Sequence, residues 1–289
     1  MEQFSDSPLG QAKTLLLATD GSGFSEGAVR AAIFFSQTCQ AKIIVLHVVP
    51  TGTESIGAAN LAVRRGWEEL TPHFDRIRAM SRDSGVEMEI VSLGSSNLEK
   101  TLIEQARLRQ ADVILMGRRG VAGRWSRLVG KTTLRVIAQK FPRVLVVPKE
   151  FAFTGMRIMV AINDSPNSRQ AALDALHLGQ ICPSLEEITV MSVAAREKER
   201  QLCAPLVEAV CDQARRMELS VPCRPRVEVG DPVKTIVKVA GERKIDMIVL
   251  GGPDQSWLTK LLKGDVAENI IGLGHCATLV VTAQNAANT

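Results

Sequence analysis

The sequence contains no tyrosine, and aromatic residues make up only 4% of its 289 residues. Because aromatic side chains supply the stacking surfaces that single-stranded nucleic acids need, this scarcity argues against a nucleic-acid-binding protein. The net charge of +4 is too small to indicate an anionic partner by itself. No apolar run approaches the ~20 residues of a membrane-spanning helix. We therefore expect neither a nucleic acid nor a membrane among the partners.

Close cysteine pairs and metal-binding motifs are also missing. The six cysteines are scattered and include no CxxC pair. The opening residues, MEQFSDSPLGQ, lack the basic start and apolar run of a secretory signal. Together these features predict reduced thiols in a cytoplasmic protein. The four histidines show no metal spacing, so we expect no metal site. His47 lies inside an apolar segment, where a buried and hydrogen-bonded imidazole is expected.

What the sequence does contain is an internal repeat. TLLLATDGSGFSEGAVRAAI begins at Thr14, and RIMVAINDSPNSRQAALDAL begins at Arg157. Each is an apolar run followed by a polar turn and a helical pattern. Four further apolar segments recur in the same order, pairing 42–49 with 187–194, 88–94 with 224–230, 111–117 with 245–251, and 143–148 with 277–282. The hydrophobic content of 45% is enough to form a core in each repeat.

Each repeat predicts an α/β domain. Strands that are apolar throughout and alternate with helical patterns are typical of parallel strands covered by helices on both faces. We expect two tandem, doubly wound domains with five-stranded parallel sheets, over residues 1–149 and 150–289, joined by a linker within 148–155. The offset between the repeats falls from 145 residues at the second strand to 136 at the third. We assign this excess in the first repeat, within 51–66, to a connecting loop.

Ligands of such sheets bind at the carboxyl ends of the strands, which directs attention to the turns after the first and fourth strands. After the fourth strand, the first repeat reads MGRRGVAGRWSRLVGKTT over 116–133. Glycines let backbone N–H groups approach a phosphate closely. Six basic and no acidic residues lie within 117–135, which favours an anion. The alternative is a flexible loop beside a solvated basic helix face.

The matching segment of the second repeat, GGPDQSWLTKLLKGDVAEN over 251–269, has a different charge. Asp254 replaces the second glycine of the first repeat, and Asp265 stands at the position of Lys131. The segment sums to −1, where the first repeat has +6. Because carboxylates repel phosphate, we expect the second repeat to bind phosphate poorly or not at all.

The turn after the first strand differs between the repeats in the same sense. Asp20 in ATDGS corresponds to Asn163 in AINDS. A carboxylate at this edge can accept a hydrogen bond from a ribose hydroxyl or an adenine amine. The alternative is an ordinary turn or helix-capping residue, because Asp-Gly-Ser is common turn chemistry.

Taken in order, the TDGS turn, the LHVV strand, the G-x2-G-x9-G segment opened by MG and the closing VLVVP strand resemble the universal stress protein family. The resemblance covers nearly the whole chain in two copies. It implies an adenine-nucleotide α-hydrolase-like, Rossmann-like fold, pairing between the repeats through their final strands, and a role in stress responses. It also implies binding of ATP, with Mg²⁺ as an optional companion, and allows a homodimer.

By position, the resemblance implies a nucleotide site in the first repeat. The residues carried over are Thr19, Asp20, Val48, Met116, Gly117, Gly120, Gly130, Lys131 and Thr132. One departure from the family pattern stands out: the family usually has Ser or Thr directly after the last glycine, and here it is Lys131. No catalytic motif and no paired general acid and base can be named, so we expect at most weak ATP hydrolysis. The alternatives are an interaction or dimerisation module without nucleotide, and a slow ATPase or phosphotransfer enzyme.

Overall fold

The computed structural model describes residues 11–52, 55–119, 129–153, 155–252 and 266–284. The first repeat contains β1 (Thr14–Ala18), α1 (Glu26–Cys39), β2 (Lys42–Pro50), α2 (Ile56–Asp83), β3 (Met88–Ser95), α3 (Leu98–Leu108), β4 (Val113–Gly117), α4 (Lys131–Ala138) and β5 (Arg143–Val147). The second contains β6 (Met156–Ala161), α5 (Pro166–Ile181), β7 (Leu185–Ala194), α6 (Arg200–Arg216), β8 (Cys223–Val229), α7 (Pro232–Glu242), β9 (Met247–Gly251), α8 (Val266–Leu273) and β10 (Ala277–Val281). Short 3₁₀ turns at Gly23–Ser25 and Glu197–Glu199 precede α1 and α6.

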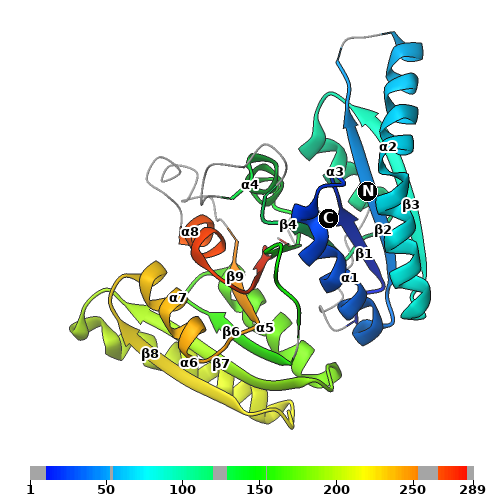
Figure 1. Cartoon of the computed structure of the whole chain (residues 1–289). Helices are drawn as coiled ribbons and strands as arrows, with labels where there is room; N and C mark the ends of the chain where they lie inside the picture. Colours follow the sequence, from blue (N-terminus) through cyan, green and yellow to red (C-terminus); the bar gives the residue numbers. More distant parts are fainter. Residues whose placement is uncertain (1–10, 53–54, 120–128, 154, 253–265, 285–289) are drawn as a thin grey trace.

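The two repeats have the same strand order. It is β3-β2-β1-β4-β5 in the first and β8-β7-β6-β9-β10 in the second, with every pair inside a repeat parallel. This confirms the predicted pair of doubly wound, five-stranded domains. Strands β5 and β10 pair antiparallel, with Leu145 opposite Leu279, so the repeats share one ten-stranded sheet whose ends are β3 and β8 (Figure 1). The intramolecular pairing therefore runs through the final strands.

Helices cover both faces of this sheet. Alternate strand residues point to opposite sides, so both faces carry apolar side chains that need to be buried. Leu15 and Leu17 belong to a core that includes buried residues of α1, α2, α5 and α6, so this core runs through both repeats. Leu16 and Ala18 belong to a core with α3 and α4 on the other face. A third core packs α7 and α8 on that same face of the second repeat.

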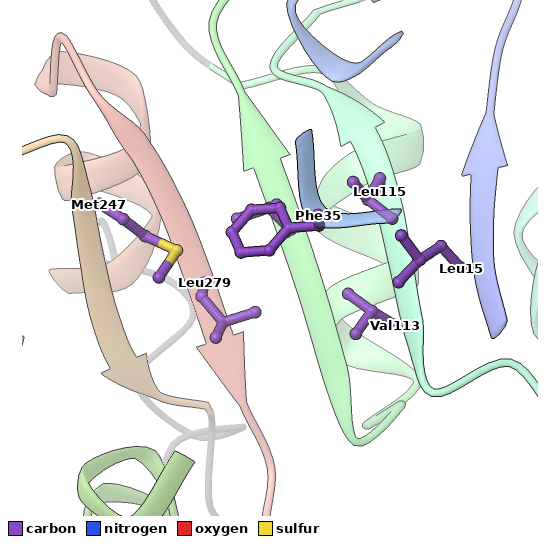
Figure 2. A pocket seen from close by; sticks show the side chains of 7 residues that line it. Leu15, Phe35, Val113, Leu115, Met247 and Leu279 are labelled. Atoms are coloured by element: carbon purple, nitrogen blue, oxygen red, sulfur yellow. The ribbon is translucent and has the colours of Figure 1, made fainter. Parts of the chain in front are cut away.

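The seam between the repeats is mostly apolar. A small cavity there is lined by Leu15, Phe35, Val113, Leu115, Leu145, Met247 and Leu279 (Figure 2). One buried ion pair also crosses the seam. Arg143 of β5 donates from Nε and Nη2 to the Asp174 carboxylate of α5 at 2.6 and 3.0 Å, and the two side chains are 5% and 0% exposed. The seam thus combines a dry core with one bidentate charge pair.

Helix α2 corrects the loop predicted within 51–66. It has 28 residues, whereas its counterpart α6 has 17. The helix starts at Ser55, whose side chain accepts a hydrogen bond from the backbone N–H of Ala58. The extra residues of the first repeat therefore lengthen a helix. They do so because side chains at helical spacing contact the ends of the neighbouring strands.

Candidate functional site

The register of the sheet brings three predicted site residues to its carboxyl edge. Ala18, the last residue of β1, pairs with Leu46 of β2 and with Met116 of β4. Asp20 follows Ala18 by two positions, and Val48 follows Leu46 by two. Because strand side chains alternate, Val48 and Met116 lie on the face covered by α3 and α4, and Asp20 stands in the turn after β1, at the carboxyl edge of the same sheet. Val48 and Met116 are buried in the core of that face, 8% and 6% exposed, whereas Asp20 is exposed at the edge.

Asp20 also makes the turn that the alternative interpretation expected. Its Oδ1 accepts hydrogen bonds from the Ser22 backbone N–H at 3.0 Å and the Ser22 hydroxyl at 2.6 Å. Gly21 has φ +74°, and a Cβ there would lie 2.1 Å from a methyl of Leu70 in α2. The TDGS turn is therefore restricted both by backbone conformation and by the helix above it.

Thr19 faces the other side of the sheet. Its hydroxyl is buried and lies 3.0 Å from the Ser25 hydroxyl and 3.1 Å from Nε2 of His73 in α2, and it accepts from the Gly21 N–H at 3.1 Å. Thr19 thus fastens α2 to the turn after β1.

His73 is the residue of this region that the sequence pattern did not indicate. Its Nδ1 lies 3.4 Å from Nη2 of Arg76, which can only donate, so the proton of the neutral ring is on Nε2 and faces Thr19. Burial, helped by the charge of Arg76, lowers the pKa of His73 below its ordinary value. Its neighbour His47 is buried, with Nδ1 3.0 Å from the Thr19 carbonyl oxygen. That is the satisfied imidazole predicted for His47.

A face of α2 covers the carboxyl ends of the first three strands. Val63 lies against Gly94 of β3, and Gly66 lies against Val49 of β2. Leu70 and His73 continue the same face onto the turn after β1. The spacing 63, 66, 70, 73 is that of one helix face. A sequence signal was present in this spacing, but the extra residues of the first repeat were assigned to a connecting loop, where insertions usually collect.

The two ends of the glycine segment after β4, at Gly117 and Gly130, lie close together. A Cβ at Gly117 would lie 2.6 Å from the Phe24 carbonyl oxygen, so close packing under the turn before α1 already requires glycine there. The Gly130 N–H donates to the Arg118 carbonyl at 2.8 Å, and the Thr133 hydroxyl donates to the Gly117 carbonyl at 3.2 Å. These bonds hold the start of α4 beside the end of β4.

The first turn of α4 has the features of an anion site. Its N-cap residue is Gly130, with φ −62° and ψ 140°, and no side chain caps the helix. Lys131 is exposed at the first helical position, Thr132 is half-buried, and the turn contains no acid. A cation at the positive end of a helix is unfavourable unless an anion lies nearby. Gly120 lies outside the described residues.

At least two of the six basic residues in this segment, Arg118 and Arg135, have protein partners. Nη1 of Arg118 donates to the carbonyl oxygens of Gly274 at 2.8 Å and Gly272 at 3.3 Å, at the end of α8 in the second repeat. Burial lowers the pKa of the Arg118 guanidinium. Arg135 pairs with Glu99 of α3 at 3.3 Å. The charge of +6 therefore overstates what faces a phosphate, and Arg118 connects the repeats instead.

The second repeat builds the same turn and then closes it differently. Oδ1 of Asn163 accepts from the Ser165 N–H at 3.1 Å, as Asp20 does in the first repeat. Asn167 then donates from Nδ2 to the Gly252 carbonyl at 2.8 Å and accepts from the Ala283 N–H at 2.8 Å. Its side chain thus ties α5 to the segments after β9 and β10. Outside the described residues lie Asp254 and Asp265.

Two negative findings concern only the described part of the chain. Within it, none of the helices combines the length and the hydrophobicity needed to cross a bilayer. The same residues include no cluster of three or more His, Cys, Asp or Glu side chains placed to hold a metal ion.

Comparisons with known proteins give the same duplicated pattern. The sequence model of the universal stress protein family matches residues 11–148 and again residues 156–282. A universal stress protein of Methanocaldococcus jannaschii is 28% identical over 141 residues, which are 47% of this chain and 82% of that protein. Another from Thermus aquaticus is 28% identical over 138 residues, 47% of this chain and 98% of that protein.

Among solved structures, the universal stress protein from Archaeoglobus fulgidus matches the fold with a TM-score of 0.74 at 17% identity. That match covers 94% of this chain and 99% of the other. Each repeat is matched by the family, and the whole chain is matched by a universal stress protein of similar architecture. The chain belongs to the universal stress protein family and carries two copies of its domain in tandem.

Proposed function

We propose that the first repeat binds an adenine nucleotide, ATP, and that the chain serves as a regulatory protein in stress responses. One observation carries this proposal. The exposed Asp20 follows β1 at the carboxyl edge of the sheet, where Val48 of β2 and Met116 of β4 bring apolar side chains to one face. The uncapped start of α4 follows at the end of β4. An apolar floor, an acceptor and a helix N-terminus are the three elements that an adenine nucleotide needs.

The carboxylate is the element that gives this site its preference. A ribose hydroxyl or an adenine amine would donate to Asp20, and a charged acceptor makes such a bond roughly twice as strong as a neutral one. The turn itself does not require the charge, because Asn163 makes the same backbone hydrogen bond in the second repeat. The negative charge of Asp20 is therefore not needed to form the turn.

The phosphates would lie at the first turn of α4. Backbone N–H groups there have no side-chain cap, and the helix dipole favours negative charge. Lys131 adds a positive charge at the position where the family usually has a hydroxyl, and Thr132 follows it. Mg²⁺ enters this proposal as the counter-ion of the bound phosphates.

The second repeat serves as a pairing or regulatory copy in this proposal. Asn163 lacks the charge of Asp20, and Asn167 spans the edge with hydrogen bonds to Gly252 and Ala283. We expect one nucleotide per chain, and the cytoplasm remains the location that we predict for this role. Any hydrolysis is expected to be slow, since the sequence offers no acid–base pair for the site.

Calorimetric titration of the full chain with ATP, with and without Mg²⁺, tests this proposal. We expect one site per chain, and weaker binding by Gly130→Val, because a branched side chain would obstruct the approach to α4. The backbone angles of Gly130 accept a side chain, so the fold should persist. Gly241→Val in α7 is the control, since a Cβ there meets no atom within 4 Å. Absence of binding would instead support the interaction module, and sustained phosphate release would support an enzyme.

A further inference from the structure

Two thiols meet at the outer edge of the second repeat. Cys211 lies in the last turns of α6 and is 1% exposed, and Cys223 is the half-buried first residue of β8. Their sulfur atoms are 3.1 Å apart and share a hydrogen bond. In sequence they are separated by the end of the helix and a short turn. Only the packing of α6 on β8 brings them into contact.

The shared hydrogen bond makes the two thiols unequal. It lowers the pKa of Cys211 and, with burial, raises the pKa of Cys223. The charge of Arg215, one turn along α6, lowers both. Other buried thiols of the chain differ: burial raises the pKa of Cys39 to about 11 and that of Cys276 to about 12. Reactivity with oxidants requires the thiolate, so this pair differs in kind from the inert core thiols.

The first repeat has no such pair. When β3 is aligned with β8, the residues of the first repeat that correspond to Cys211 and Cys223 are Asp75 and Glu87. The thiols are therefore not needed for an α/β repeat to fold in this way. They are a property of the second repeat, which has Asn163 at the position of Asp20.

We propose that Cys211 and Cys223 form a reversible disulfide when the chain meets a hydroperoxide. The Cys211 thiolate attacks one oxygen of the hydroperoxide, the O–O bond breaks, and the other oxygen leaves and takes up the proton that Cys211 released. The resulting sulfenic acid is attacked by the Cys223 sulfur, and the S–O bond breaks as water leaves with the Cys223 proton. Overall, the two thiols lose two electrons. An organic hydroperoxide is reduced to one alcohol and one water, and hydrogen peroxide is reduced to two waters.

The disulfide would join α6 to β8, the strand at the outer end of the sheet. It would close a short loop around the turn between these elements and so restrict the unfolded chain. Reduction by a dithiol reverses the step through thiol–disulfide exchange. The second repeat would then exist in two states of different stability that depend on the oxidant present.

The test treats the reduced, folded full chain with hydrogen peroxide, blocks the remaining thiols under denaturing conditions and maps the products by mass spectrometry. Trypsin cuts between the two cysteines after Arg215 and Arg216. The disulfide therefore links peptide 201–215 to peptide 217–226. Because Cys203 lies in the first of these peptides, the measurement uses Cys203→Ser as the parent.

We expect a loss of two thiols, the linked peptide pair, recovery of both thiols with dithiothreitol, and a higher thermal midpoint for the oxidised chain. Cys211→Ser and Cys223→Ser in the same background should each abolish the linked pair and the shift. The proposal is overturned if peroxide leaves both thiols free in the folded parent. It is equally overturned if the linked pair forms only after unfolding in urea, because the native contact would then play no part.

Discussion

The two repeats share a fold and a strand order, yet they differ at the carboxyl edge of the sheet. In the first repeat, the turn after β1 places Asp20 at the edge, and α4 starts at the end of β4 without a side-chain cap. In the second, Asn167 bridges the corresponding segments with two side-chain hydrogen bonds. A duplicated backbone can therefore keep its core and still assign different roles to its two edges. The residues that differ lie in turns and helix starts, where the core does not restrict them.

The longer α2 adds a second difference. It covers the strand ends of the first repeat, and its His73 fastens to Thr19 beneath the TDGS turn. The shorter α6 makes no such contact with the described residues of its own turn, where Asp164 takes the place of Gly21 without the constraint from Leu70. The turn of the first repeat is therefore held by two residues of α2, Leu70 and His73. Such preorganisation favours ligand binding because less ordering remains to be done.

The largest effect is expected from breaking the buried ion pair at the seam, which has no counterpart at the repeat-related positions. Arg143 and Asp174 form the buried pair, whereas the repeat-related positions are Ala277 and Ala31. Asp174→Ala leaves a buried guanidinium unpaired, which should lower the free energy of unfolding by about 3–5 kcal/mol. Equilibrium urea unfolding measures this loss.

The matched control replaces both partners of the seam pair with apolar residues. Arg143→Met combined with Asp174→Leu should recover most of the lost stability, because no buried charge is left without a partner. If Asp174→Ala stays within about 1 kcal/mol of the parent, the pair is not the buried contact described above.

Exchanging the turn residues of the repeats tests the proposed nucleotide site. Asp20→Asn should weaken ATP binding at least tenfold, corresponding to about 1.5 kcal/mol for a charged hydrogen bond. The thermal midpoint should not change, because Asn163 shows that an amide makes the turn. Asn163→Asp is the reciprocal control and should create no new site. Equal affinity of Asp20→Asn and parent in calorimetry would remove Asp20 from the site.

The basic residues near α4 can be separated by function. Arg118→Ala should lower stability by about 1–2 kcal/mol, because it removes hydrogen bonds to the carbonyl end of α8. ATP affinity should stay nearly unchanged. Lys131→Ala should do the reverse, weakening ATP several-fold while stability is kept, since its side chain is exposed. Urea unfolding and calorimetry on the two variants check both results. If both variants change stability and ATP affinity alike, the two residues do not have the separate roles assigned here.

The smallest effect concerns pH and His73. Burial lowers its pKa in the folded chain, so between the folded and unfolded pKa values the unfolded state binds more protons. Stability should therefore fall as the pH drops below the ordinary histidine value of about 6.5. His73→Gln removes this titrating group and should flatten that part of the profile. Thermal unfolding of both proteins from pH 8 to pH 5 provides the measurement, and parallel profiles would exclude His73 as the cause.

Much of the architecture could be predicted because it follows from local periodicity. The segments 42–49 and 187–194 became β2 and β7, with bounds that differ by one or two residues. The doubly wound topology followed from apolar strands that alternate with helices. The failure at α2 has a physical cause: a helix that is half exposed carries a weak apolar pattern, and its start at Ser55 is set by capping and by contacts with distant strands.

The candidate site was predictable in position and only partly in detail. Asp20, Val48 and Met116 reach the same edge because residue order places them at the carboxyl ends of neighbouring parallel strands. Thr19 stands next to Asp20 in sequence, yet its hydroxyl contacts His73 of α2, which is 54 positions away. Arg118 was counted with the phosphate segment, yet its guanidinium lies on α8. No local pattern could indicate that partner, which is more than 150 positions away.

By itself, the sequence determined that this protein has two α/β repeats, with an acidic turn and a basic segment in the first and an amide turn in the second. These features follow from residue type and local spacing. Only the tertiary structure decided that α2 fastens to Thr19, that Arg118 joins the repeats, and that Cys211 meets Cys223. The reason is that a side chain's partner depends on how distant elements pack. That packing is set by the shared sheet and its cores, not by the residues next to it in the chain.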